Sequence, residues 1–154
     1  MKQNIQIMNQ IYKNFYSIID TERKYKKLGH NYISMEMFIE KEVIKFIMGV
    51  PEEHIENMEK LISSFYIGAV VDTIDAPKLL EAGKYMAGGE FVLTKGNAYP
   101  IKTYESFEAD PMDSILSAYS KVFTDEKMCL QILVSPLDEK VLKTLRKEAK
   151  SIKE

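Results

Sequence analysis

The run from Met128 to Val134 restricts the fold of this chain more than any other segment, because six of its seven residues are apolar. In a strand, successive side chains point to opposite faces. One face would carry Leu130, Ile132 and Val134, and the other Cys129, Gln131 and Leu133. Apolar residues on both faces predict a strand in the sheet interior rather than at its edge. We therefore expect Ile132→Ala to cost roughly 2–5 kcal/mol. The Gln131 amide should find a hydrogen-bond partner or point toward a gap in the cover of the strand.

Other segments alternate between helical and strand patterns. Apolar residues spaced by three and four predict helices over 5–19, 51–65, 110–122 and 139–152, and residues 78–85 are a candidate short helix after the break at Asp75-Ala76-Pro77. β-branched and aromatic runs predict further strands over 32–39, 42–50, 67–74, 90–94 and 99–104. The first two strands should form a hairpin through Glu40-Lys41, and the last two a second hairpin around residues 95–98. The strand over 67–74 is apolar at nearly every position and should be central.

Helix starts are marked by local signals. Asp110 is a candidate N-cap, with Pro111 at the first helical position, and this helix should turn Ile115, Ala118, Tyr119 and Val122 inward. In the last helix the inward positions are Val141, Leu142, Leu145, Ala149 and Ile152, and the solvated ones Lys140, Lys143, Lys147 and Lys150.

The order of these elements predicts an α+β fold. Hairpins combined with strand-helix-strand crossovers favour a mixed or antiparallel sheet with packed helices, of the ferredoxin-like, split βαβ type. The length of 154 residues fits a single domain over 1–154. A strand followed by proline and acidic residues occurs at Val50-Pro51 and again at Ser135-Pro136, so residues 1–75 and 86–154 are a candidate pseudo-repeat.

Charge and cysteine content indicate the cellular compartment of the protein and the surfaces that it could contact. With 21 basic and 23 acidic residues the net charge is −2, so contact with nucleic acid or an anionic membrane would have to be local. The single cysteine, Cys129, excludes an internal disulfide and fits a reducing compartment. No apolar run reaches the roughly 18 residues of a membrane span. We expect a cytoplasmic protein.

No pattern in the sequence indicates catalysis. Gly83-Lys84-Tyr85 is not a phosphate-binding loop, because Lys78 stands where its first glycine is needed and Tyr85 replaces the Ser or Thr. His30, His54 and Cys129 have no metal-site spacing, and the acidic residues Glu105, Glu108, Asp110 and Asp113 are explained as the start of a helix. The chain is therefore predicted not to be an enzyme and to hold no cofactor or metal.

One basic run could contact nucleic acid. Its residues are Arg23, Lys24, Tyr25, Lys26 and Lys27, four charges around one aromatic ring. A solvated loop is the favoured interpretation, because Glu22 and the overall net charge dilute the patch. Any binding should be weak, and four phosphate contacts predict a log-log salt slope of about −3 to −4.

Several segments together resemble the N-terminal region of conjugation-type ATPases of type IV secretion systems, which are related to the HerA and FtsK motors. The segments are residues 8–12, 15–18, 32–37, 46–51, 99–111, 114–121 and 131–136. They cover most of the chain, but none is a catalytic motif.

The resemblance implies a non-catalytic assembly and docking domain that acts through protein-protein contacts. Its expected partners are a P-loop motor domain or secretion-system components, with a homo-oligomer as a further option. Contact with the inner face of the membrane would be indirect, through those partners. The alternative is a small nucleic-acid-binding module of ferredoxin-like fold.

Overall fold

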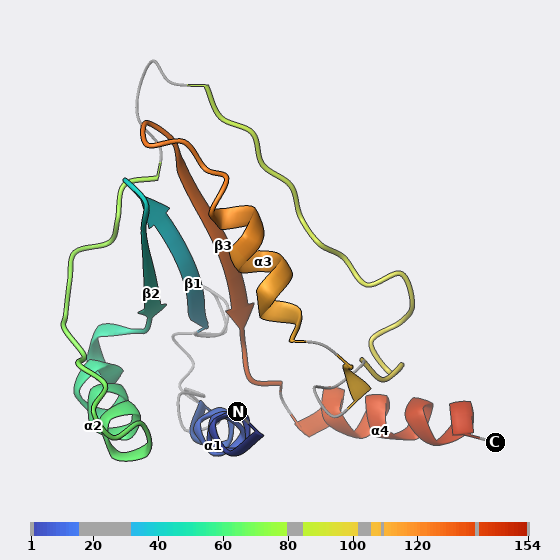
Figure 1. Ribbon diagram of the computed structural model, residues 1–154. Helices are drawn as coiled ribbons and strands as arrows, with labels where there is room; N and C mark the ends of the chain where they lie inside the picture. The colour runs from blue at the N-terminus through green and yellow to red at the C-terminus, as the bar shows by residue number, and fades with distance from the viewer. Residues whose placement is uncertain are drawn as a thin grey trace.

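The computed structural model describes residues 2–15, 32–79, 85–101, 106–108, 110–137 and 139–153. The elements are α1 (Lys2–Asn14), β1 (Ile33–Glu40), β2 (Val43–Gly49), the 3-10 helix η2 (Glu52–His54), α2 (Ile55–Phe65), α3 (Pro111–Tyr119), β3 (Lys127–Val134) and α4 (Glu139–Lys153). The strands form one antiparallel sheet in the order β2-β1-β3 (Figure 1). The predicted α+β class is confirmed. The ferredoxin-like detail is not, because the described residues contribute only three strands.

β1 and β2 form a hairpin with a two-residue turn. Glu40 pairs with Val43, and the turn residues Lys41 and Glu42 have φ of 51° and 65°. Positive φ at both central positions gives a turn whose twist matches that of the flanking strands. The hairpin was predicted, but its turn lies one residue later than Glu40-Lys41.

The odd-numbered residues of β1 point to the face of the sheet that the helices cover. At one end Ile33 packs with Ile11 and Phe15 of the N-terminal segment and with Met58 of α2. All four side chains are buried, and they form the first core cluster. Met58, Ile62 and Phe65 supply the predicted apolar stripe of α2, which joins this cluster.

At the other end of the same face, α3 covers Met37 and Ile39. Tyr119 is only 1% exposed and forms the centre of this second cluster. Ile115 and Val122 pack against it as predicted. Ala118, which was also expected to face inward, is exposed.

The start of α3 follows the sequence prediction. Asp110 is the N-cap, its side chain accepts a hydrogen bond from the Met112 backbone N–H at 2.9 Å, and Pro111 follows it at the first helical position. At α2 the proline stands one position earlier than predicted, because Pro51 is the cap of η2 rather than its first residue.

β3 confirms the predicted strand over 128–134, but its predicted interior position is wrong. β3 pairs with β1 alone among the described strands, so it forms one edge of the sheet. Ile132 is 53% exposed and Leu133 is 59% exposed. β3 therefore has apolar side chains on both faces, but neither face of this strand is fully covered in the structure.

Three other predicted strands do not form within the described residues. Residues 67–74, expected to be central, have no strand structure, and Ile67 and Val70 are exposed. Residues 90–94 and 99–101 also lack strand structure, so the hairpin predicted for 90–104 does not form in these residues. Residues 102–104, the end of its second strand, are not among the described residues. In Figure 1 the described residues 67–79 and 85–101, between α2 and α3, run outside the sheet without strand structure.

Some predictions fall wholly or largely outside the described residues: the polar loop over 20–30, the end of the first helix past residue 15, and most of a helix over 78–85. The pseudo-repeat of 1–75 and 86–154 stays a prediction. None of the helices in the described ranges has both the length and the hydropathy needed to cross a membrane.

Candidate docking surface

The basic residues Arg23, Lys24, Tyr25, Lys26 and Lys27, predicted as a nucleic-acid contact, all lie outside the described residues. So do His30 and Glu105. Their predicted roles therefore stay predictions, and the site is built from the remaining chain.

The described residues contain no group of three or more His, Cys, Asp or Glu side chains placed to hold a metal ion. Of the acidic residues predicted to open a helix, Asp110 caps α3 and Asp113 lies in its first turn. His54 ends η2, far along the chain from Cys129 in β3. These groups have structural places in helix starts and strands.

Cys129 is half-buried on β3, on the face of the sheet opposite to α3. Burial raises the pKa of its thiol, and the negative charge of Glu36 raises it further. A raised pKa disfavours the thiolate, which is the nucleophilic form. The environment of Cys129 is therefore the reverse of what a catalytic cysteine needs.

A short polar network lies on this second face. Glu36 Oε1 accepts hydrogen bonds from Ser34 Oγ and from Gln131 Nε2, both at 2.8 Å. The expectation that Gln131 finds a partner is thus confirmed. A Cβ at Gly49 would meet Ser34 Oγ, so glycine there lets β2 lie close to this network.

Glu40 joins all three strands near the hairpin. Its carboxylate lies 3.0 Å from Lys127 Nζ on β3 and 3.9 Å from Lys45 Nζ on β2. The hydrogen bond from Lys127 lowers the pKa of Glu40, and the charges of Lys45 and Lys41 add to this effect. These pairs tie the two edge strands to β1.

We expect Glu40→Gln to weaken the acid dependence of stability. Because the pKa of Glu40 is lower in the folded state, its contribution is present above the unfolded pKa and is lost as pH falls through the folded pKa. Urea unfolding between pH about 5 and about 3 should show a shallower fall for the variant than for the wild type. Glu59→Gln, an exposed carboxylate on α2, is the control. Parallel pH curves for Glu40→Gln and the wild type would contradict this.

An apolar band remains open on the helix-covered face, between the two core clusters. Phe46 of β2 lies opposite Met37, and Ile132 of β3 lies opposite Met35. Phe46 is 73% exposed, although its neighbour Met37 is buried. Met35 is only partly covered, and the Tyr12 hydroxyl of α1 lies 3.8 Å from its sulfur. We call Phe46, Met35 and Ile132 the open band.

The open band spans the sheet from edge to edge. Strand residues on this face are covered by α1 and α2 at one end and by α3 at the other, and the two exposed side chains lie on the two edge strands between them. Large apolar residues gathered on one face of a folded chain are typical of a contact surface. This surface could accept an apolar segment of another protein.

Sequence reasoning missed the open band because it treated the strand over 128–134 as covered on both faces and made no prediction about the cover of the strand over 42–50. The feature that reveals the open band is the pairing of β1 with β2 and β3. Once β1 is central in an antiparallel sheet, the residues across from Met35 and Met37 must lie on edge strands. Which of them the helices leave uncovered cannot be read from periodicity.

These features define an α+β domain whose helix-bearing sheet face is incompletely covered. The chain belongs to the family described as "Domain of unknown function (DUF8128)", whose sequence profile matches residues 2–154. No curated protein and no solved structure shows significant similarity to the chain.

Proposed function

We propose that this chain is a non-catalytic docking domain that binds another protein through the open band. The observation that supports this most directly is the exposure of Phe46 and Ile132 on the face that otherwise forms the core. Phenylalanine exposed on a rigid strand is a typical interface anchor, because a large apolar area can be buried with little loss of side-chain entropy.

The sheet is suited to hold these anchors in place. β1 is hydrogen-bonded on both sides, and the Glu40 ion pairs join β2 and β3 to it across the opposite face. A preorganised surface loses less entropy on binding than a flexible one. Burying Phe46 and Ile132 fully would each contribute up to about 1.5–3 kcal/mol before the costs of association, less the part already covered.

The resemblance to conjugation-type ATPases supports a particular partner, the P-loop motor domain of a type IV secretion ATPase. Phe46 lies in the resembling segment 46–51, Met35 in 32–37, and Ile132 in 131–136. On this proposal the domain helps such a motor to assemble or dock, and the motor performs the catalysis.

The test uses the P-loop ATPase encoded in the same gene or beside it, recognised by its G-x-x-x-x-G-K-[ST] motif. Its purified motor domain should bind the chain in calorimetry. Phe46→Ser combined with Ile132→Ser should weaken binding by about 10- to 100-fold, as expected for two anchor residues. Circular dichroism should show that the variant keeps its fold, since both side chains are already largely exposed.

The matched control is Phe91→Ser combined with Val92→Ser. These residues are also exposed, at 94% and 73%, but they lie outside the sheet. Equal losses for the control and the open-band variant would contradict the proposed surface, and no binding by the wild type would contradict the proposed partner. Tight nucleic-acid binding at physiological salt would favour the alternative function instead.

A further inference from the structure

α4 differs in charge from the rest of the chain. It contains six basic residues, at positions 140, 143, 146, 147, 150 and 153, and two acidic ones, Glu139 and Glu148, so its net charge is +4. The whole chain has a net charge of −2, and the remainder therefore carries −6. The last helix therefore has a net positive charge, whereas the rest of the chain taken together has a net negative one.

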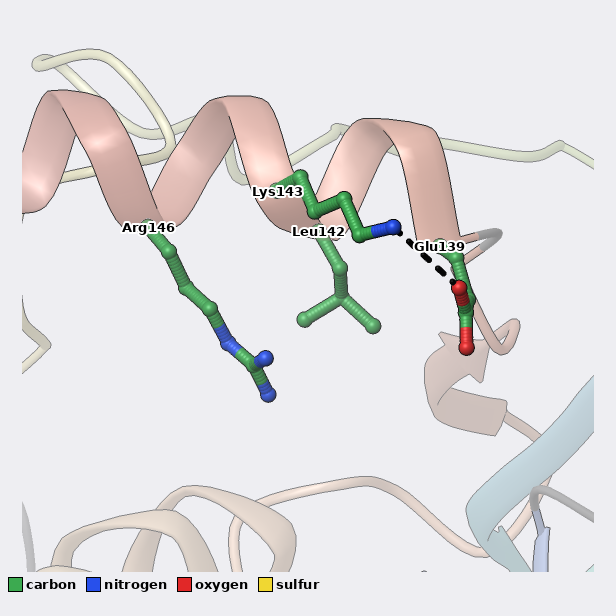
Figure 2. A pocket seen from close by; sticks show the side chains of 4 residues that line it. All are labelled: Glu139, Leu142, Lys143 and Arg146. Carbon is green, nitrogen blue, oxygen red and sulfur yellow. Dashed lines mark ion pairs between the residues drawn. The ribbon is translucent and has the colours of Figure 1, made fainter.

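The apolar residues of α4 form one continuous stripe. At 100° per residue, Val141, Leu142, Leu145, Ala149 and Ile152 fall within a sector of ~100°, which is the width of a helix face that contacts one surface. The basic residues occupy a broader sector that begins beside Leu142 with Arg146 and extends to Lys147, which lies opposite the centre of the stripe. Figure 2 shows this border, where Leu142, Lys143 and Arg146 project to the same side of the helix and Lys143 lies 3.5 Å from Glu139.

The described helices and strands cover this stripe only in part. Val141 and Ile152 are exposed, and Leu142, Leu145 and Ala149 are partly buried. In Figure 1 α4 extends away from the sheet beyond the end of β3. The inward orientation predicted for Val141 and Ile152 is therefore wrong.

We propose that α4 lies flat on an anionic membrane surface. The apolar stripe would enter the boundary between headgroups and acyl chains, and the lysines and Arg146 would contact anionic headgroups. Strong amphipathicity, low mean hydropathy and clustered basic residues are the features of such helices. The net negative charge of the remaining chain provides no overall attraction to the same surface. This goes beyond the indirect membrane contact that the resemblance implies.

Two features favour lipid over other anionic partners. A nucleic acid would neutralise the basic residues but leave the apolar stripe in water. The centres of protein interfaces are enriched in aromatic residues, whereas the stripe is entirely aliphatic. A lipid surface satisfies both sectors of the helix at once.

Vesicle flotation with the full chain tests the proposal. Binding to vesicles of phosphatidylcholine with about 30 mol% phosphatidylglycerol should exceed binding to pure phosphatidylcholine by at least about tenfold. The difference should shrink as salt rises from about 0.1 M to about 1 M, because the screening length falls from about 10 Å to about 3 Å. Equal binding to both vesicles would overturn the proposal.

Paired variants separate the charge from the apolar stripe. Lys147→Glu with Lys150→Glu, and separately Leu142→Ser with Leu145→Ser, should each reduce binding to anionic vesicles by about tenfold or more. Lys60→Glu with Lys121→Glu makes the same charge change on exposed residues elsewhere, and should leave binding unchanged. A loss as large in this control would overturn the assignment to α4.

Two further measurements identify a different occupant. A DNA duplex that binds through Lys147 and Lys150 while the vesicles do not would replace lipid with nucleic acid. Light scattering that shows salt-sensitive self-association through α4, again without vesicle binding, would replace it with a second copy of the chain. Either result would overturn the membrane proposal.

Discussion

Tyr119→Ala should destabilise the domain by about 3–5 kcal/mol, a large part of the free energy of unfolding of a typical domain. Tyr119 is 1% exposed and forms the centre of the cluster that holds α3 against Met37 and Ile39. Truncation would leave a cavity between α3 and the sheet that the surrounding side chains can fill only in part. Urea unfolding at neutral pH measures this effect.

The Tyr119 hydroxyl has a separate role that Tyr119→Phe isolates. It donates a hydrogen bond of 2.8 Å to the backbone carbonyl of Met37 in the central strand. Burial also raises the pKa of this phenol, so it stays protonated and able to donate. The phenylalanine variant keeps the ring and should lose only about 1 kcal/mol. Losses of similar size for the two variants would contradict the packing role of the ring.

Ile33→Ala should cost about 2–5 kcal/mol, whereas Ile132→Ala should cost about 1 kcal/mol. Both residues are isoleucines on the same face of the same sheet. Ile33 is 0% exposed in the central strand and packs with Ile11 and Met58, while Ile132 is 53% exposed on the edge strand. Removing a half-exposed side chain loses less buried area and leaves no closed cavity.

The cost expected for Ile132→Ala is therefore lower than the roughly 2–5 kcal/mol that the sequence predicted. Urea unfolding of the two variants, side by side, measures the difference directly. A cost for Ile132→Ala equal to that of Ile33→Ala would show that Ile132 is covered in solution. That result would remove one end of the open band and weaken the docking proposal with it.

The candidate docking surface could be predicted only in part. The apolar runs over 32–50 and 128–134 predicted the three strands that contain Met35, Phe46 and Ile132. That these three residues share a face depends on the register between strands, which is set by pairing across distant parts of the chain. Their exposure depends further on where the helices pack.

By itself the sequence determined those features of this protein whose hydrogen bonds are local. Asp110 and Pro111 start α3 through contacts within three residues, and the β1–β2 hairpin closes between Glu40 and Val43, although its turn lies one residue later than the sequence predicted. Such contacts need no distant partner, so they can be read from neighbouring residues.

Only the tertiary structure decided which apolar segments are buried. Residues 67–74 resemble a strand as strongly as 128–134 do, but a strand forms only where another strand pairs with it, and residues 67–74 pair with neither edge strand of this sheet. The pattern of α4 likewise predicted a helix and its apolar stripe, but not that Val141 and Ile152 of the stripe would be exposed. A helix satisfies its backbone within itself, whereas burial of a face requires a surface that the rest of the chain must provide.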